Sequence, residues 1–151
     1  MQVPYKRISE LDKYGMHFPR SFCTVDRQVF FPFASHPLTQ TFLLRLEGDI
    51  CRYPFECTND SSYKADAASF HQKALCLAET SLSPTDDAYL TLMASVSYLL
   101  RLDAHKELHA MYEGHFKNLM LSLDPLDSGE YTRDTTFVQI MSMDLPQTSL
   151  Q

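Results

Sequence analysis

The residue types best suited to chemistry gather in DAHKELHAMYEGH, residues 103–115, which holds three of the six histidines. His105 and His109 stand four positions apart, and two imidazoles at that spacing on a helix can bind one metal ion. In the zinc-protease pattern HExxH the glutamate follows the first histidine directly, whereas Glu107 comes one position later. Its side chain therefore points about 100° further round the helix. Glu107 is not placed as the general base of that pattern.

The remaining histidines do not complete a metal site. His115 follows His109 by six residues, so their side chains are about 9 Å apart along a helix axis and about 120° apart around it. A second helix carrying His71 could supply a further ligand, but no feature of the sequence places it there. We therefore expect His115 to be packed, His105 and His109 to lie at the surface or its boundary, and no metal to be bound.

Nucleophilic catalysis has one candidate pair, Cys76 and His71. Their five-residue separation puts them on different faces of one helix, and Cys76 lies in an Ala/Leu run typical of an inert core thiol. The acidic pair Asp86 and Asp87 suits the positive end of a helix dipole better than acid–base work. No GxSxG or Gly-rich phosphate loop is present, and the chain has only four glycines. We predict a non-enzymatic protein without catalytic, cofactor-binding or metal-binding residues.

An apolar ligand groove is a further alternative. Aromatic residues between positions 18 and 33 could line it together with four methionines, although such residues more often form ordinary core. The methionines are Met111, Met120, Met141 and Met143.

Composition narrows the classes of protein. A chain of 151 residues is long enough for one domain with a core, and its net charge of −6 disfavours direct binding to nucleic acid. None of the four cysteines forms a C-x-x-C pair, so we expect free thiols in a reducing compartment. The start has no apolar signal-peptide core, and no run reaches the roughly 18–20 apolar residues of a membrane span.

Helical periodicity dominates the middle of the chain. Pro37 suits a first helical turn and Pro54 an end, and apolar residues recur at helical spacing between them. A second helix is expected over residues 62–82. Ser83 is a natural N-cap for a third, apolar on nearly every side up to Leu102. A fourth spans residues 104–123. Short connections make consecutive helices antiparallel, so we predict an all-α antiparallel helical hairpin array of about four main helices.

The flanking segments differ from this core. Residues 1–35 are rich in aromatic rings and proline, which predicts an irregular segment. After residue 125, LDSGEYTRD is turn-like, and TTFVQIMSM alternates like a lone strand or an irregular arm. We expect three parts: the segment 1–35, a helical domain 36–124 and a poorly ordered tail 125–151.

The run from KALCLAETSLSP to HFKNLMLSL resembles the regulatory region of fungal-specific transcription factors, which usually carry an N-terminal Zn2Cys6 cluster. Ala74, Leu75 and Leu77 match its first helix, residues 90–102 its long apolar helix, and Asp103 the following turn. Its last helix is matched by Ala110, Gly114 and Leu119. Met111 replaces a histidine often found there, and the cysteine cluster is absent.

This resemblance implies a non-enzymatic regulatory or protein-interaction domain in the nucleus, either a truncated or a stand-alone transcription regulator. Its partner would be another protein or a second copy, with no direct binding to nucleic acid and no membrane. Two alternatives stay open. One is a small intracellular fungal enzyme or accessory protein with a pocket between its helices, using His71, His105, His109 or His115. The other is a TPR-like helical scaffold.

Overall fold

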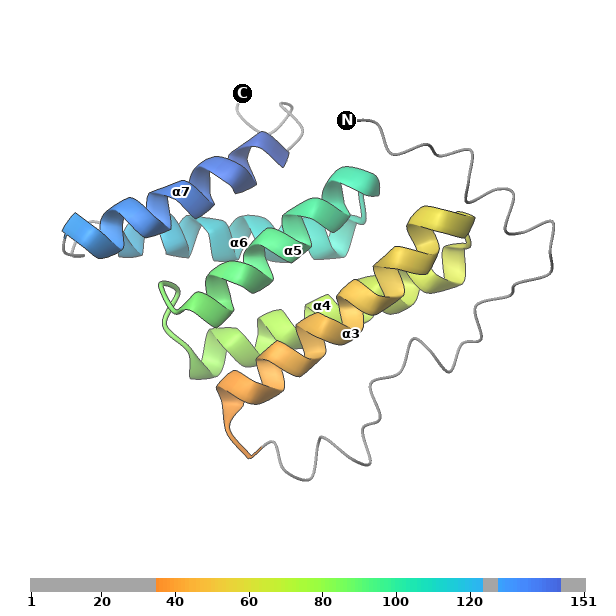
Figure 1. Ribbon diagram of the computed structural model, residues 1–151, viewed down its shortest axis with the longest axis horizontal. Helices are drawn as coiled ribbons and strands as arrows, with labels where there is room; N and C mark the ends of the chain where they lie inside the picture. The colour runs from red at the N-terminus through yellow and green to blue at the C-terminus, as the bar shows by residue number, and fades with distance from the viewer. Residues whose placement is uncertain (1–34, 124–127, 145–151) are drawn as a thin grey trace.

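The computed structural model describes residues 35–123 and 128–144, and every regular element within these ranges is an α-helix. The chain forms a row of helical hairpins, shown in Figure 1. The prediction of an all-α antiparallel hairpin array is therefore confirmed. The helices are α3 (Pro37–Thr58), α4 (Ser61–Ser81), α5 (Asp87–Leu102), α6 (Lys106–Ser122) and α7 (Ser128–Asp144).

The helices form two layers. In Figure 1, α3, α5 and α7 lie side by side in one layer, with α4 and α6 behind them. Because each helix of the front layer is followed by an antiparallel helix of the back layer, α3, α5 and α7 run in the same direction. The most extensive contact joins α3 to α4.

The central helix is α5, which contacts all four of the others. Its fully buried side chains lie on one half of the helix, whereas Thr91, Ser95 and Tyr98 on the other half are only partly buried. The fully buried ones include Leu90, Leu92, Met93, Val96, Leu99 and Leu100.

Two helix ends differ from the predicted ones. Helix α3 continues through Pro54 to Thr58, because the hydroxyl of Thr58 donates to the carbonyl of Pro54 (2.8 Å) and the N–H of Asn59 donates to Phe55 (2.8 Å). Asn59 ends the helix in the left-handed conformation (φ 57°). Helix α5 begins after Asp86 rather than after Ser83, whose N–H donates to the Asp86 carboxylate (2.9 Å).

Helix α7 corrects the prediction for the C-terminal part of the chain, where we expected a turn followed by a strand or arm. Local β-branched character is overridden by packing, because Met141 is buried and Phe137 and Val138 pack against the core. Together with buried Asp134 these residues follow the i, i+3, i+4, i+7 spacing of a helix face. The described ranges thus hold five main helices instead of four. The division at 1–35, 36–124 and 125–151 stays a prediction, and residues 1–34, 124–127 and 145–151 lie outside the described ones.

None of the helices within the described ranges is long and apolar enough to cross a membrane.

Candidate functional site

Four charged residues lie along one face of α3, and we call them the charged row: Arg45, Asp49, Arg52 and Glu56. Their spacing of four, three and four residues brings each next to the following one on a helix. Arg45 Nη1 lies 3.3 Å from Asp49 Oδ2, and Arg52 Nε lies 3.7 Å from Asp49 Oδ1. Arg52 Nη1 donates to Glu56 Oε1 at 2.7 Å. Two guanidinium groups are thereby held in place by two carboxylates.

Asp49 joins three helices. Ser95 of α5 donates its hydroxyl to Asp49 Oδ2 (3.3 Å), and Nε2 of buried His71 on α4 lies 3.7 Å from Asp49 Oδ1. The second distance is longer than a hydrogen bond. Burial acts to raise the pKa of Asp49, but the polar contact with His71 and the charges of His71, Arg52 and Arg45 outweigh it and lower the pKa below 3.8. The carboxylate is therefore ionised at neutral pH and anchors both arginines.

Arg52 is fixed between two aromatic rings. The centre of its guanidinium lies 4.7 Å from the ring centroid of Tyr53 and 4.4 Å from that of Tyr98 on α5. Only 12% of its side chain is exposed. Stacking on a ring face leaves the N–H donors at the edge of a guanidinium available to an anion. Arg52 is thus a pre-positioned donor at the seam between α3 and α5.

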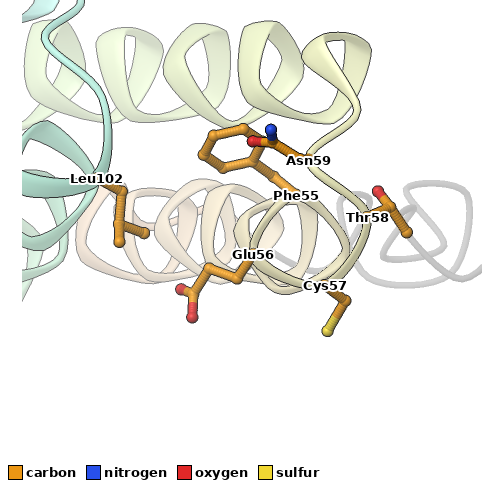
Figure 2. A pocket seen from close by; sticks show the side chains of 6 residues that line it. All are labelled: Phe55, Glu56, Cys57, Thr58, Asn59 and Leu102. Atoms are coloured by element: carbon orange, nitrogen blue, oxygen red, sulfur yellow. The ribbon is translucent and has the colours of Figure 1, made fainter. Parts of the chain in front are cut away.

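The seam has a hollow at each end. Near the start of both helices, a hollow of about 370 Å³ is lined by residues of α3 and of the first turns of α5. Near their ends, a hollow of about 340 Å³ is lined by the last residues of α3, its cap Asn59 and Leu102 of α5, as Figure 2 shows. We call them the N-terminal and the C-terminal hollow. The first is lined by Leu38, Thr39, Phe42, Arg45, Asp87, Ala88 and Thr91.

The four histidines considered from the sequence have four different partners. His105 caps α6, its Nδ1 accepting from the N–H of Leu108 (3.3 Å). His109 faces Glu113 on the same helix (3.5 Å). His115 is buried, as expected, against the hydroxyl of Tyr89, and His71 faces Asp49. Neither hollow is lined by a histidine, and no group of three metal-binding side chains occurs in the part of the chain that the structure describes.

Cys76 corrects a prediction. Its side chain is exposed, whereas the sequence favoured a core thiol. The core face of α4 passes through Ala74, Leu75 and Ala78, and Cys76 lies off that face. The imidazole of His71 points into the interior, so the two residues form no catalytic pair.

The structure also locates most of the other residues that the sequence suggested as candidates. Asp86 caps α5 and Asp87 lies in its first turn. Of the methionines, Met141 is buried, Met111 packs on the core and Met120 is exposed; the side chain of Met143 and the aromatic residues 18–33 lie outside the described part. The charged row was not predicted, although its spacing is visible in the sequence.

Fold and site together define an all-α array that carries two ion-paired arginines, Arg45 and Arg52, where α3 packs against the parallel helix α5. The model of the 14-3-3 protein family matches residues 19–147, most of the chain. The chain therefore belongs to the 14-3-3 family. No curated protein matches it significantly. Because 14-3-3 proteins are non-enzymatic adaptors or scaffolds, the prediction that this chain is not an enzyme is confirmed.

The family match overturns the resemblance to fungal Zn2Cys6 transcription factors and the regulatory function built on it. The alternatives of a metabolic enzyme and of a TPR-like scaffold are wrong as well. The resemblance rested on hydrophobic spacing in consecutive hairpins, which any antiparallel helical array has. The predicted role in transcription is therefore wrong, and the nuclear location inferred from the resemblance loses its basis. Members of the 14-3-3 family bind protein partners, as predicted here, and are generally cytosolic and also nuclear.

Proposed function

We propose that this chain is a phosphoserine-binding adaptor that holds a phosphorylated segment of a partner protein on the seam between α3 and α5. Membership of the 14-3-3 family supports a phosphoserine-binding regulatory role. The observation that carries the proposal is the placement of Arg52 between Tyr53 and Tyr98, with Arg45 two helical turns away on the same face.

The chemistry of the seam suits a phosphate group. A phosphoserine carries a charge of about −1.5 to −2 at pH 7 and three acceptor oxygens. Guanidinium groups match such oxygens with parallel N–H donors and stay charged at all relevant pH values. Tyr53 is exposed, and its hydroxyl is a further donor close to Arg52. Asp49 holds both guanidinium groups in place before a ligand binds. The two arginine side chains therefore lose less conformational entropy on binding.

The same carboxylates make the site selective. Asp49 and Glu56 neutralise the charges of Arg45 and Arg52. A weakly charged ligand therefore gains little electrostatic free energy by binding at the seam. A phosphate dianion can displace Glu56 from Arg52, whereas an unmodified serine cannot. Binding should therefore depend strictly on phosphorylation and weaken with added salt.

We further propose that the chain self-associates. Dimerisation is a property of 14-3-3 proteins. Two copies would present two seams to one partner carrying two phosphoserines, which raises the apparent affinity through effective concentration. The absence of nucleic-acid binding remains a prediction based on the net charge of −6.

Fluorescence anisotropy with one peptide, prepared with serine or phosphoserine, tests the proposal. We expect the phosphorylated form alone to bind, and Arg52→Ala to weaken it at least tenfold because one charge-assisted contact is lost. Lys117→Ala, an exposed position on α6, serves as the charge-matched control. Equal binding of both peptides, or equal loss in the two variants, would refute the proposal, provided circular dichroism shows both variants folded.

A further inference from the structure

His71 of α4 lies directly behind the charged row. Its side chain is fully buried, and its Nε2 atom lies 3.7 Å from Asp49 Oδ1. The ring reaches this place because Gly48, the residue before Asp49, has no side chain in its way. Within the described ranges, neither nitrogen of the ring has a hydrogen-bond partner. A buried polar group without a partner is costly, so a histidine at this position needs an explanation beyond packing.

The oxygen that His71 faces also faces Arg52. Arg52 Nε lies 3.7 Å from Asp49 Oδ1 and is itself buried. In the part of the chain that the structure describes, neither this nitrogen nor Asp49 Oδ1 forms a hydrogen bond. The other carboxylate oxygen, Oδ2, accepts from Ser95 and lies 3.3 Å from a guanidinium nitrogen of Arg45. Oδ1 therefore lies between two donors, and a shift of less than about 1 Å would bring it within hydrogen-bond distance of either one.

A phosphate bound to Arg52 would change the surroundings of Asp49. Its oxygens compete with both carboxylates of the charged row for the N–H donors of the guanidinium. A buried carboxylate that loses part of its pairing is strongly destabilising unless another donor replaces the lost one. His71 can be that donor, because Nε2 can carry a proton in both the neutral and the charged imidazole and already faces Asp49 Oδ1. Ser95, by contrast, binds the opposite oxygen.

We infer that His71 is a positioning residue of the phosphoserine site, and that it donates a hydrogen bond to Asp49 Oδ1 when a phosphate draws Arg52 away from that oxygen. This inference rests on the proposed function. His71 acts through Asp49 and does not touch the ligand, since it is buried between α3 and α4 whereas the seam lies between α3 and α5. The hydrogen bond lowers the free energy needed to release Arg52, and it thereby raises the affinity for the phosphorylated segment.

The test is the affinity of the full chain for the phosphoserine peptide, measured by fluorescence anisotropy in His71→Leu and His71→Gln. Leucine offers no donor, so binding should weaken about tenfold, the effect of one lost hydrogen bond to a charged group. The glutamine amide can donate, so His71→Gln should retain most of the affinity. His109→Leu, at a half-exposed position of α6, is the control and should bind like the wild type.

A double-mutant cycle separates this role from a merely structural one. In an Asp49→Asn background the charged acceptor is missing, so His71→Leu should change the affinity less than about twofold. A second measurement needs no variant. In the wild-type protein, the phosphoserine peptide should shift the nitrogen-15 resonance of His71 Nε2, and the serine peptide should leave it unchanged.

Several results would overturn the inference. They are an unchanged affinity in His71→Leu, a loss of the same size in the Asp49→Asn background, a loss in His71→Gln as large as in His71→Leu, and a His71 resonance that the phosphoserine peptide does not shift. Reduced stability in urea without reduced affinity would overturn it as well, because His71 would then serve packing alone. Phosphate-dependent binding that is unaffected by His71→Leu refutes this inference alone, whereas equal binding of the serine and phosphoserine peptides refutes the proposed function.

Discussion

The imidazole of His71 on α4 lies against the backbone of Gly48 on α3, so closely that a Cβ at position 48 would lie 2.6 Å from its Cδ2 and Nε2 atoms. This contact lets α3 and α4 approach where His71 meets Asp49. Here the glycine is required by the neighbouring side chain, since Gly48 lies within a regular helix.

Gly48→Ala should therefore destabilise the protein by about 1–3 kcal/mol through overpacking, despite a gain of up to about 1 kcal/mol in helix propensity. Gly114→Ala on α6 is the matched control, because no atom lies within 4 Å of a Cβ there; it should stabilise. Urea unfolding measures both. Equal effects of the two substitutions would contradict the close contact.

Asp49 makes the protein sensitive to acid. Because its folded-state pKa lies below the usual 3.8, its contribution is fully present above that value and is lost as the pH falls through the folded-state pKa. Asp49→Asn should reduce the free energy of unfolding by about 1–3 kcal/mol at pH 7, and the difference from wild type should shrink below pH 4. Asp66→Asn, an exposed carboxyl on α4, is the control. A difference that stays constant with pH would contradict the charge-based account.

The Tyr89–His115 pair should make the stability of the protein depend on pH in a higher range than Asp49 does. Burial lowers the pKa of His115 below 6.5, opposed in part by Glu79, and burial together with Glu79 raises the pKa of Tyr89 to about 12. At neutral pH the protonated tyrosine hydroxyl is therefore hydrogen-bonded to Nδ1 of a neutral imidazole. Because the unfolded state takes up the proton first, stability is full above pH 6.5 and falls as the pH drops below it.

His115→Gln should flatten that dependence between pH 7 and pH 5. Tyr89→Phe should cost about 1 kcal/mol at pH 7 by removing the hydrogen bond. Thermal unfolding followed by circular dichroism measures both effects, with His109→Gln as the control at a half-exposed position. An unchanged pH profile in His115→Gln would show that another group is responsible.

Glu56 competes with the phosphate for Arg52, at an Nη1–Oε1 distance of 2.7 Å. Glu56→Gln should therefore tighten binding of a phosphoserine peptide several-fold, because the variant removes a carboxylate that the ligand must displace. Anisotropy titrations provide the measurement, and Glu113→Gln on α6 is the control. Weaker binding would instead mean that Glu56 is needed to hold Arg52 in place.

Cysteine reactivity should rank with exposure. Cys76 is exposed, Cys57 is half-buried and Cys51 is buried. Burial, with a contribution from Glu56, raises the pKa of the Cys57 thiol and lowers its thiolate fraction. Among these three, a thiol reagent at pH 8 should modify Cys76 first and Cys51 only on unfolding. Peptide mapping by mass spectrometry gives the order, and fast labelling of Cys51 would contradict its burial.

The course of most helices follows from the sequence because apolar residues recur at helical spacing. Residues 90–102 are apolar on nearly all sides, and the structure makes this helix the centre of the array. Helix α7 was not predicted, because β-branched residues suggested a strand while the helical stripe from Asp134 to Met141 was short. Family and function could not be obtained this way, since unrelated helical arrays have the same apolar periodicity.

The charged row shows most clearly what the sequence determines and what only the tertiary structure determines. The sequence by itself determined that Arg45, Asp49 and Arg52 share one face of a helix, because a helix repeats every 3.6 residues. Only the tertiary structure decided that Ser95 and His71 meet Asp49 and that Tyr98 covers Arg52. These residues come from helices distant in sequence, and their meeting depends on how α4 and α5 pack against α3. Helical periodicity determines which residues share one face of a helix. The packing of side chains between helices determines which residues of other helices contact that face.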